Sequence, residues 1–317
     1  MTKAGRPPEL FPPDLVAEAA ATIAEGSTSF AAAARLLDPA TRESAALLYA
    51  WCRHCDDVID GQTLGHAARP SDGCAGARLD VLEAATRAAL AGRPPEASPF
   101  RALSAVAARH AIAPDLPLAH LAGFRLDVEG RRYETLDDLL VYCWGVAGVV
   151  GVMMARIMGV RDHDTLDRAA DLGLAFQLTN VARDVAEDAA VGRVYLPLAW
   201  LDEVGVPADA VGDPAHRAAV AQVAGRLVAA AEPFYDSALV GIGRLPVRSA
   251  AAIGAARSVY RAIGRKVVAR REAAWEARTH TSRAEKLIQV ARGTGAAVGA
   301  RALTRRPRDP ALWRQDA

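Results

Sequence analysis

From residue 176 to residue 197 the chain reads FQLTNVARDVAEDAAVGRVYLP. Asn180, Asp184 and Asp188 are four residues apart, so a helix would place these oxygen-bearing side chains on one face. The valines and the alanine that follow each of them by one residue would lie on the adjacent face and pack into a core. Gly192 is a typical residue just beyond a helix end. The stretch therefore predicts a helix whose polar ridge faces a cavity.

A second stretch, LLYAWCRHCDDVID at residues 47–60, repeats this pattern. Its polar side chains share one helical stripe: Tyr49, Arg53, Asp56 and Asp60, with Asp57 beside it. Carboxylates one turn apart repel each other and destabilise a helix unless a cation offsets the repulsion. A single acidic face is usually solvated, but two such helices could hold Mg²⁺ between them, with a diphosphate completing the coordination.

Composition limits the remaining function classes. The chain has 317 residues, of which 51% are hydrophobic, so it can bury a large core in one or two domains. Lysine and arginine total 38 against 37 acidic residues, and this balance argues against nucleic-acid binding through overall charge. The first residues lack an apolar signal region, and four cysteines are too few for a disulfide framework. We expect a cytoplasmic protein.

The rest of the chain predicts helices, and the absence of an alternating strand pattern indicates an all-α fold. The last predicted helix, at residues 247–275, is interrupted only at Gly254 and Gly264. Besides the two acidic stretches, the helices are expected at residues 15–24, 30–37, 78–91, 99–111, 115–129, 214–231, 232–243 and 247–275.

Residues 139–155, LLVYCWGVAGVVGVMMA, contain no charged residue, so a membrane span has to be considered. The stretch is short for a span and rich in glycine. Its small residues at 145, 148, 152 and 155 would form a smooth helical face, which allows either close helix packing or a groove for an apolar chain. We favour a core helix lining a long apolar pocket.

Several longer motifs occur in order: SFAAAARLL, LYAWCRHCDDVID, GFRLDVEGRRYETLDDLLVYCWGVAGVVG and LGLAFQLTNVARDVAEDAAVGRVYLP. From about Ser27 to Lys266 the chain resembles the squalene/phytoene synthase family, and most closely its bacterial phytoene-forming members. The resemblance implies a single-domain isoprenoid synthase fold, in which two aspartate motifs face each other across a central cavity. We expect a flexible arm at residues 1–14, the synthase domain at 15–295 and a basic tail at 296–317.

The resemblance also implies roles for individual residues. The expected metal ligands are Asp56, Asp57, Asp60, Asn180, Asp184 and Asp188. The expected substrate-binding residues are Ser27, Ser29, Phe30, Tyr49, Arg53, Gln177, Asn180 and Tyr260. The expected catalytic residues are Asp56, Asp60, Asp184, Asp188, Tyr142 and Arg53. Two of these assignments have simpler alternatives: the serines could only cap a helix, and the tyrosines could only pack in the core.

The implied reaction is a Mg²⁺-dependent, head-to-head joining of two geranylgeranyl diphosphates through a cyclopropyl diphosphate, giving a C40 hydrocarbon. Mn²⁺ could replace Mg²⁺, and no NADPH is expected. Three alternatives remain open. Relatives that join two farnesyl diphosphates share these motifs, a class I terpene cyclase would use similar acidic chemistry, and some members of the superfamily are not catalytic.

The expected product has no polar group, so the enzyme must deliver it to a bilayer. We expect peripheral contact at the inner face of the cell membrane. The arginine-rich segment 301–317, with Leu312 and Trp313, could touch an anionic membrane surface, or it could be disordered.

Overall fold

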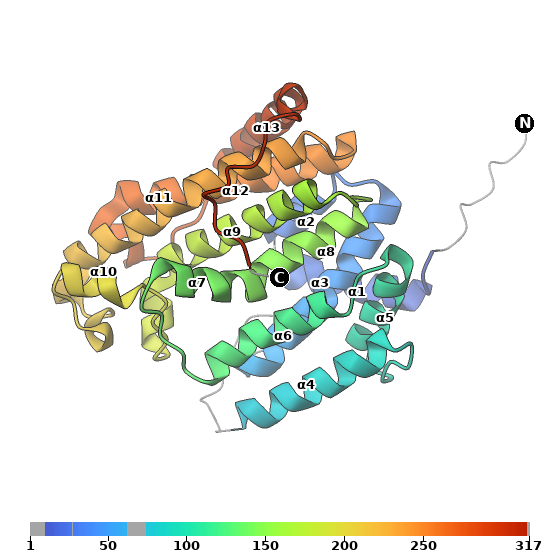
Figure 1. Ribbon diagram of the computed structural model, residues 1–317, viewed down its shortest axis with the longest axis horizontal. Coiled ribbons are helices and arrows are strands. Elements are labelled where there is room, and N and C mark those ends of the chain that lie inside the picture. Colours follow the sequence, from blue (N-terminus) through green and yellow to red (C-terminus); the bar gives the residue numbers. More distant parts are fainter. Residues whose placement is uncertain (1–9, 27, 62–73, 316–317) are drawn as a thin grey trace, which may run out of the picture. The chain divides into compact units, whose positions relative to one another are not determined.

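The computed structural model describes residues 10–26, 28–61 and 74–315 (Figure 1). These residues form helices and connecting turns, and no strand occurs among them, which confirms the all-α prediction. The chain separates into two compact units, Met1–Pro114 and Asp115–Ala317, and each unit is described by itself.

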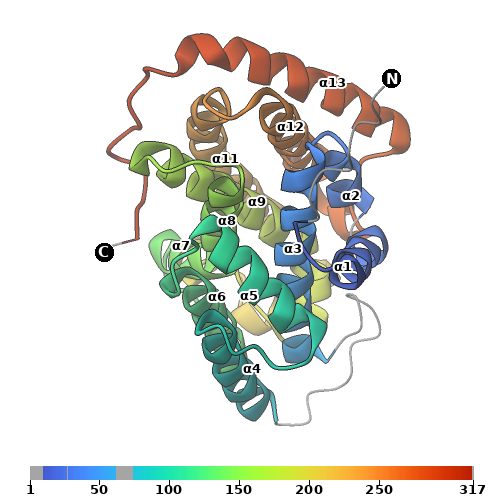
Figure 2. The same cartoon turned by 90° about the vertical axis from the view of Figure 1, so that its right-hand side faces the viewer.

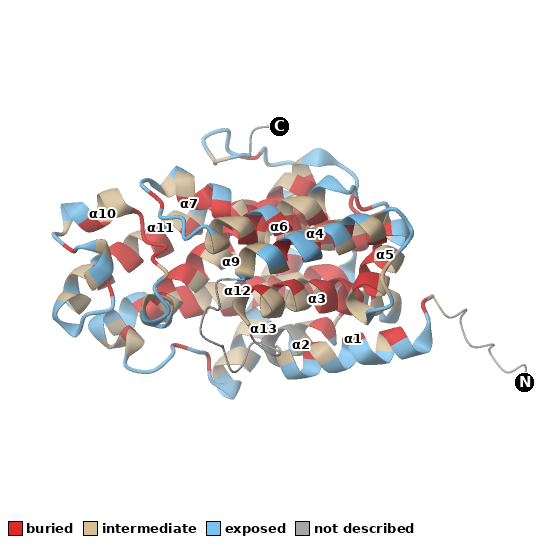
Figure 3. Cartoon of the chain, turned by 90° about the horizontal axis from the view of Figure 1, so that it is seen from below, coloured by how far each residue is buried: buried red, intermediate tan, exposed pale blue. Residues whose placement is uncertain are grey.

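The first unit is organised around the long helix α3, which packs against α1, α4 and α5. Figure 3 shows α3 mostly as buried or half-buried and α1 mostly as exposed. The helices of this unit are α1 (Pro13–Gly26), α2 (Thr28–Ala34), α3 (Pro39–Asp60), α4 (Ala75–Leu90) and α5 (Ser98–His110).

Local sequence signals fix both ends of α3. Asp38 caps its start by accepting a hydrogen bond from the Thr41 backbone N–H at 3.0 Å, and Pro39 occupies the first turn, where it costs no hydrogen bond. Gly61 ends the helix in the left-handed conformation, with φ of 61°. The second acidic stretch therefore lies wholly on a well-defined helix, as its periodicity predicts.

The second unit surrounds another long helix, α9, which packs against α8, α11 and α12 (Figure 2). The α-helices of this unit are α6 (Asp115–Val128), α7 (Leu136–Cys143), α8 (Val149–Ile157), α9 (His163–Ala190), α10 (Leu198–Glu203), α11 (Arg217–Ile242), α12 (Val247–Arg270) and α13 (Arg283–Gly299). Its shorter turns are η1 (Trp144–Gly148), η2 (Ala208–Ala210), η3 (Pro214–His216), η4 (Arg271–Trp275) and η5 (Ala300–Leu303).

The ends of α9 carry caps as well. Asp162 accepts a hydrogen bond from the Thr165 backbone N–H at 2.9 Å. At the other end Gly192 has φ of 78°, and the Arg193 N–H reaches back to the Asp188 carbonyl at 2.9 Å, as in a Schellman motif. The predicted helix end at Gly192 is confirmed.

The uncharged stretch belongs to the continuous helical run 136–157. By length and composition, this run is the one in the described part of the chain that could cross a membrane, but 61% of its most apolar window is buried. Gly145 packs so closely on Gly123 of α6 that a Cβ on Gly145 would lie 2.7 Å from the Gly123 Cα. The small residues thus serve close helix packing, and the run is a core element. Its lining of an apolar pocket stays a prediction.

The predicted break between residues 231 and 232 is wrong, because α11 is one helix with Pro233 in its interior. A proline inside a helix costs about 3 kcal/mol. Ala231, Phe234 and Tyr235 around it are all buried in the core cluster of this unit, and their packing offsets that cost.

The predicted interruptions of the next helix are also wrong, because α12 continues through Gly254 and Gly264 and ends at Arg270. Gly254 has a packing role instead. A Cβ at this position would lie 2.5 Å from the Gly293 carbonyl oxygen of α13, so the glycine lets the two helices touch.

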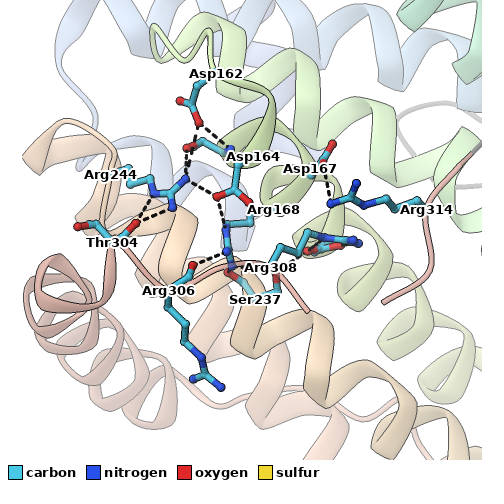
Figure 4. Close-up of polar contacts among 12 residues, drawn as sticks. Asp162, Asp164, Asp167, Arg168, Ser237, Arg244, Thr304, Arg306, Arg308 and Arg314 are labelled. Atoms are coloured by element: carbon cyan, nitrogen blue, oxygen red, sulfur yellow. Dashed lines mark hydrogen bonds and ion pairs between the residues drawn. The ribbon is translucent and has the colours of Figure 1, made fainter. Parts of the chain in front are cut away.

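The C-terminal segment is more ordered than its sequence suggests. Helix α13 continues through the predicted boundary at residues 295–296, and residues 304–315 then run back along the second unit (Figure 4). Arg168 donates to the Arg306 carbonyl at 2.7 Å, and Arg244 donates to the Thr304 carbonyl at 2.9 Å. Leu312 and Trp313 pack against the core cluster. Residues 304–315 are therefore ordered, contrary to the predicted alternative of a disordered tail. Leu312 and Trp313 are not free to insert into a bilayer.

A buried ion pair anchors this segment. Arg308 donates to both carboxylate oxygens of Asp171 on α9, at 2.7 and 2.9 Å, and its side chain is only 3% exposed. The Ser237 hydroxyl on α11 donates to the same carboxylate at 2.5 Å. The Asp171 charge is thus fully partnered inside the unit.

We expect Arg308→Met to lower the free energy of unfolding by about 3–5 kcal/mol, because it leaves the Asp171 carboxylate buried without its counter-charge. Urea unfolding followed by circular dichroism measures the change. Arg305→Met is the matched control, since Arg305 is exposed and has no ion pair within the described residues. Its effect should stay within about 0.5 kcal/mol. Equal effects of the two substitutions would contradict the anchoring role of Arg308.

Candidate functional site

The polar stripe of the first unit lies on α3, with Arg53 between its acids. Arg53 Nη1 is 3.0 Å from Asp56 Oδ2, and Arg53 Nε is 3.0 Å from Asp57 Oδ1. Burial opposes the charge of Arg53, but the two aspartates outweigh burial and raise its pKa. Asp60 is half-buried at the end of the helix. Arg53 thus offsets the repulsion between Asp56 and Asp57 and places a guanidinium where a diphosphate could bind.

Tyr49 lies one turn before Arg53 and touches the end of α1. A Cβ on Gly26 would lie 2.7 Å from the Tyr49 hydroxyl oxygen, so this contact requires glycine. Of the residues predicted to bind substrate just beyond Gly26, Ser27 lies outside the described residues. Ser29 and Phe30 belong to α2, but their side chains lie outside the description. Their roles stay predictions.

The second unit presents the ridge predicted for α9. Asp184 is held by two guanidinium groups: Arg183 Nε donates to Oδ1 at 2.7 Å, and Arg278 donates to both oxygens at 3.1 Å. Burial opposes the ionisation of Asp184, but these arginines outweigh burial and lower its pKa. Asp184 is therefore a charged carboxylate, and it is neutralised by the protein itself.

Asp188, one turn further along the ridge, has the opposite character. Burial, and then the nearby charge of Asp184, raise the pKa of Asp188 to about 8, with further contributions from Asp127 and Glu187. Arg193 opposes this rise but does not cancel it. Near neutral pH a bound cation would make ionisation of Asp188 favourable, because it would supply the missing positive charge.

Asn180 precedes Asp184 by one turn. Its Nδ2 donates to Gln177 Oε1 at 3.3 Å, so the structure brings these two predicted substrate contacts together. The Asn180 Oδ1 atom is buried and has no hydrogen-bond partner in the described part of the chain. A buried acceptor of this kind costs free energy unless a ligand satisfies it.

The donors of this ridge fit a hard cation. Amide and carboxylate oxygens are the ligands that Mg²⁺ prefers. Among the residues that the structure describes, no three histidine, cysteine, aspartate or glutamate side chains could hold a metal ion by themselves. Mg²⁺ keeps several waters and is usually bound by one or two carboxylates together with substrate phosphates, so it needs no complete protein cage. The unpartnered Asn180 oxygen and the Asp188 carboxyl suit such a site.

Tyr142 is part of a buried tyrosine cluster. Its hydroxyl donates to Asp127 Oδ2 at 3.0 Å, and the Tyr195 hydroxyl donates to Asp127 Oδ1 at 2.8 Å. The Tyr142 and Tyr195 rings stack with centroids 5.0 Å apart, and Tyr133 packs against both. Since Asp127 also influences the pKa of Asp188, the cluster lies close to the acidic ridge.

Four residues of these clusters were not predicted from the sequence: Asp127, Tyr195, Arg183 and Arg278. The first three lie inside motifs that carry the family resemblance, so the motifs contained a signal that spacing alone did not reveal. Arg278 gave no such signal, because it lies in the turn between η4 and α13 and reaches Asp184 only in the folded chain.

Tyr260 lies beside the same helix face. Its ring stacks on Phe176 of α9, with centroids 4.2 Å apart, and Phe176 is one turn before Asn180. The second unit therefore gathers Gln177, Asn180, Asp184, Asp188 and, on α12, Tyr260. The first unit separately gathers Tyr49, Arg53, Asp56, Asp57 and Asp60.

We expect Asp188→Asn to stabilise the metal-free protein at high pH. The unfolded carboxyl ionises near its ordinary pKa of 3.8, whereas the folded one ionises near 8, so its charged form destabilises the fold increasingly as the pH rises from 4 to 8. In EDTA the melting temperature of the variant should exceed that of the wild type at pH 9, and the difference should shrink toward pH 4. A difference that does not change with pH would contradict the burial of this charge.

Comparisons with known proteins agree with this geometry. Residues 23–285 match the family model described as Squalene/phytoene synthase. The chain is 53% identical over 291 residues to the 15-cis-phytoene synthase of Enterobacter agglomerans, and the match covers 92% of this chain and 98% of that protein. It is 50% identical over 304 residues to the 15-cis-phytoene synthase of Pantoea ananas, with 96% and 98% covered.

Solved structures give the same result for the fold. A crystal structure of a dehydrosqualene synthase in complex with a ligand has a TM-score of 0.79 at 26% identity, covering 89% of this chain and 96% of that one. A squalene synthase from Alicyclobacillus acidocaldarius has a TM-score of 0.70 at 24% identity, covering 84% and 97%. The fold is that of the isoprenoid synthases, and the chain belongs to the squalene/phytoene synthase family.

Proposed function

We propose that this protein joins two molecules of geranylgeranyl diphosphate head to head, releases two diphosphates and forms phytoene in carotenoid biosynthesis. The observation that carries the proposal is the identity of 50–53%, over nearly the whole chain, to proteins named 15-cis-phytoene synthase. The acidic ridges on α3 and α9 support it, because a diphosphate-ionising enzyme needs oxygen ligands for cations.

The proposed metal is Mg²⁺, for which Mn²⁺ can substitute. When bound, it acts as a Lewis acid that neutralises the diphosphate charge. The proposed metal ligands are Asp56, Asp57 and Asp60 on α3 and Asn180, Asp184 and Asp188 on α9.

The remaining polar residues would bind the diphosphate groups. Arg53 already presents a guanidinium among carboxylates, and charge-assisted bonds from arginine to phosphate oxygens are among the strongest available. Arg183 and Arg278 now hold Asp184, and they would be free to donate to phosphate oxygens once a cation takes that carboxylate. The other proposed substrate contacts are Ser27, Ser29, Phe30, Tyr49 and Gln177.

In the proposed reaction the donor loses diphosphate and becomes an allylic cation, which the acceptor's double bond attacks. Loss of a proton closes a cyclopropane, and a second ionisation, a rearrangement and a further proton loss create the central double bond. The Tyr142 hydroxyl, held by Asp127, can pass a proton at its oxygen. Tyr260 offers an aromatic face that can stabilise a cation.

A second candidate is the joining of two farnesyl diphosphates. It is favoured by the likeness to the dehydrosqualene synthase structure, although at 26% identity that likeness is much weaker than the one to phytoene synthases. Neither phytoene nor the C30 product dehydrosqualene requires a reductant, whereas squalene does. We propose that NADPH takes no part.

Incubating the protein with Mg²⁺ and either geranylgeranyl or farnesyl diphosphate, with and without NADPH, tests the proposal. The lipid extract should contain a C40 hydrocarbon from the first substrate, and NADPH should not change it. A C30 hydrocarbon formed with higher kcat/KM, a reduced product or a cyclic terpene would overturn the assignment. The absence of any product would favour a non-catalytic member of the family.

We expect each of Asp56→Ala, Asp60→Ala, Asp184→Ala and Asp188→Ala to fold normally and to lose activity by about 100-fold or more, because each removes a cation ligand that stabilises developing charge. Turnover at limiting Mg²⁺ measures the loss. Glu96→Ala is the matched control, since Glu96 is an exposed acid outside both ridges. Near-normal turnover in all four variants would contradict the proposed metal ligands.

The proposed location is peripheral, at the inner face of the cell membrane, because a C40 hydrocarbon has to leave the enzyme for a bilayer. Leu312 and Trp313 pack against the core of the second unit. They are therefore not the apolar side chains that would enter the membrane.

A further inference from the structure

Helix α13 exposes a row of apolar side chains. On a helix that turns about 100° per residue, these side chains fall within an arc of about 100°. The row consists of Ala284, Leu287, Ile288, Ala291 and Val298, with Gly295 in line between the last two. Leu287 is 73% exposed, Ile288 51% and Val298 62%. We call this row the outer face of α13.

The opposite side of α13 is committed to packing, so the outer face cannot turn inward. Gly293 meets Gly254 of α12 closely enough that a Cβ on Gly293 would lie 2.1 Å from the Gly254 carbonyl oxygen. Ala297 is 2% exposed, and the Ser258 hydroxyl donates to Gln289 Oε1 at 2.7 Å. Figure 2 shows α13 lying along the outside of α12.

Basic side chains border the outer face on both sides. From Thr281 to Arg306 the chain has six basic residues and one acid, Glu285. Glu285 is already occupied, because it accepts hydrogen bonds from Lys266 at 3.0 Å and from the Ser282 N–H at 2.6 Å. By helical position, Arg283 lies at one edge of the face and Arg292 at the other, and neither has an ion-pair partner within the described residues.

We propose that the outer face of α13 is the surface by which this protein docks on an anionic phospholipid bilayer. Apolar side chains flanked by unpaired cations are the pattern of an interfacial helix, in which the apolar row enters the acyl boundary and the cations contact the head groups. A second copy of the chain fits less well, because a two-fold contact through this face would bring its arginines together. The inference deepens the proposed peripheral location and does not depend on the reaction catalysed.

Flotation of the full chain with liposomes tests the proposal. Vesicles of phosphatidylcholine and phosphatidylglycerol should carry the protein at low salt and release it at high salt, whereas pure phosphatidylcholine should carry little. Leu287→Ser/Ile288→Ser should weaken binding at least tenfold, and Arg283→Gln/Arg292→Gln should remove most of its salt dependence. The matched controls are Val81→Ser, at an exposed valine of α4, and Arg93→Gln, at an exposed arginine outside this face.

Both control variants should bind like the wild type, and the α13 variants should keep the wild-type melting temperature. Undiminished binding of Leu287→Ser/Ile288→Ser would overturn the proposal. A dimer in sedimentation analysis that this double substitution dissociates would also overturn it, because the face would then join two copies. All variants should retain turnover on detergent-dispersed substrate, so failure of the docking proposal is distinguishable from failure of the proposed function.

Discussion

The central constraint on the second unit is electrostatic: two half-buried carboxylates, Asp184 and Asp188, lie one turn apart on the same helix, and their proximity costs free energy. The protein neutralises Asp184 with Arg183 and Arg278, but at Asp188 the opposing charge of Arg193 does not prevent a pKa of about 8. The unpartnered Asn180 oxygen lies on the same ridge. A cation would satisfy both groups at once, so the unfavourable metal-free state itself favours metal binding.

A helix that carries Asp184 and Asp188 one turn apart has to stay folded despite the repulsion between the two carboxylates. Caps define both ends of α9, and its other faces pack against α8, α11 and α12. The Arg308–Asp171 ion pair ties the C-terminal segment to the same helix. Segments far apart in sequence therefore hold α9 in place, and the cost of the buried acids is met by packing elsewhere in the unit.

Local patterns predicted the features that depend on neighbours in sequence. The four-residue spacing of Asn180, Asp184 and Asp188 and the cap at Gly192 are set by helix geometry, and both appear as expected. The helix break predicted beside Pro233 is absent, because the burial of the neighbouring side chains outweighs the proline's preference for a helix end. Contacts between residues far apart in sequence were also missed, because they form only when the chain folds. The ion pairs of Arg278 with Asp184 and of Arg308 with Asp171 leave no periodic trace in the sequence, so neither pair was predicted.

The central claim is that the α9 ridge is a cation site completed by a diphosphate. Anomalous diffraction from crystals grown with Mn²⁺ and a non-ionising thiolodiphosphate analogue of geranylgeranyl diphosphate tests it most directly. The account predicts Mn²⁺ peaks within coordination distance of Asp188 and the Asn180 Oδ1 atom, with Arg278 moved from Asp184 to the analogue's phosphate oxygens. Bound analogue without Mn²⁺ at this ridge, and with Arg278 still paired to Asp184, would contradict it.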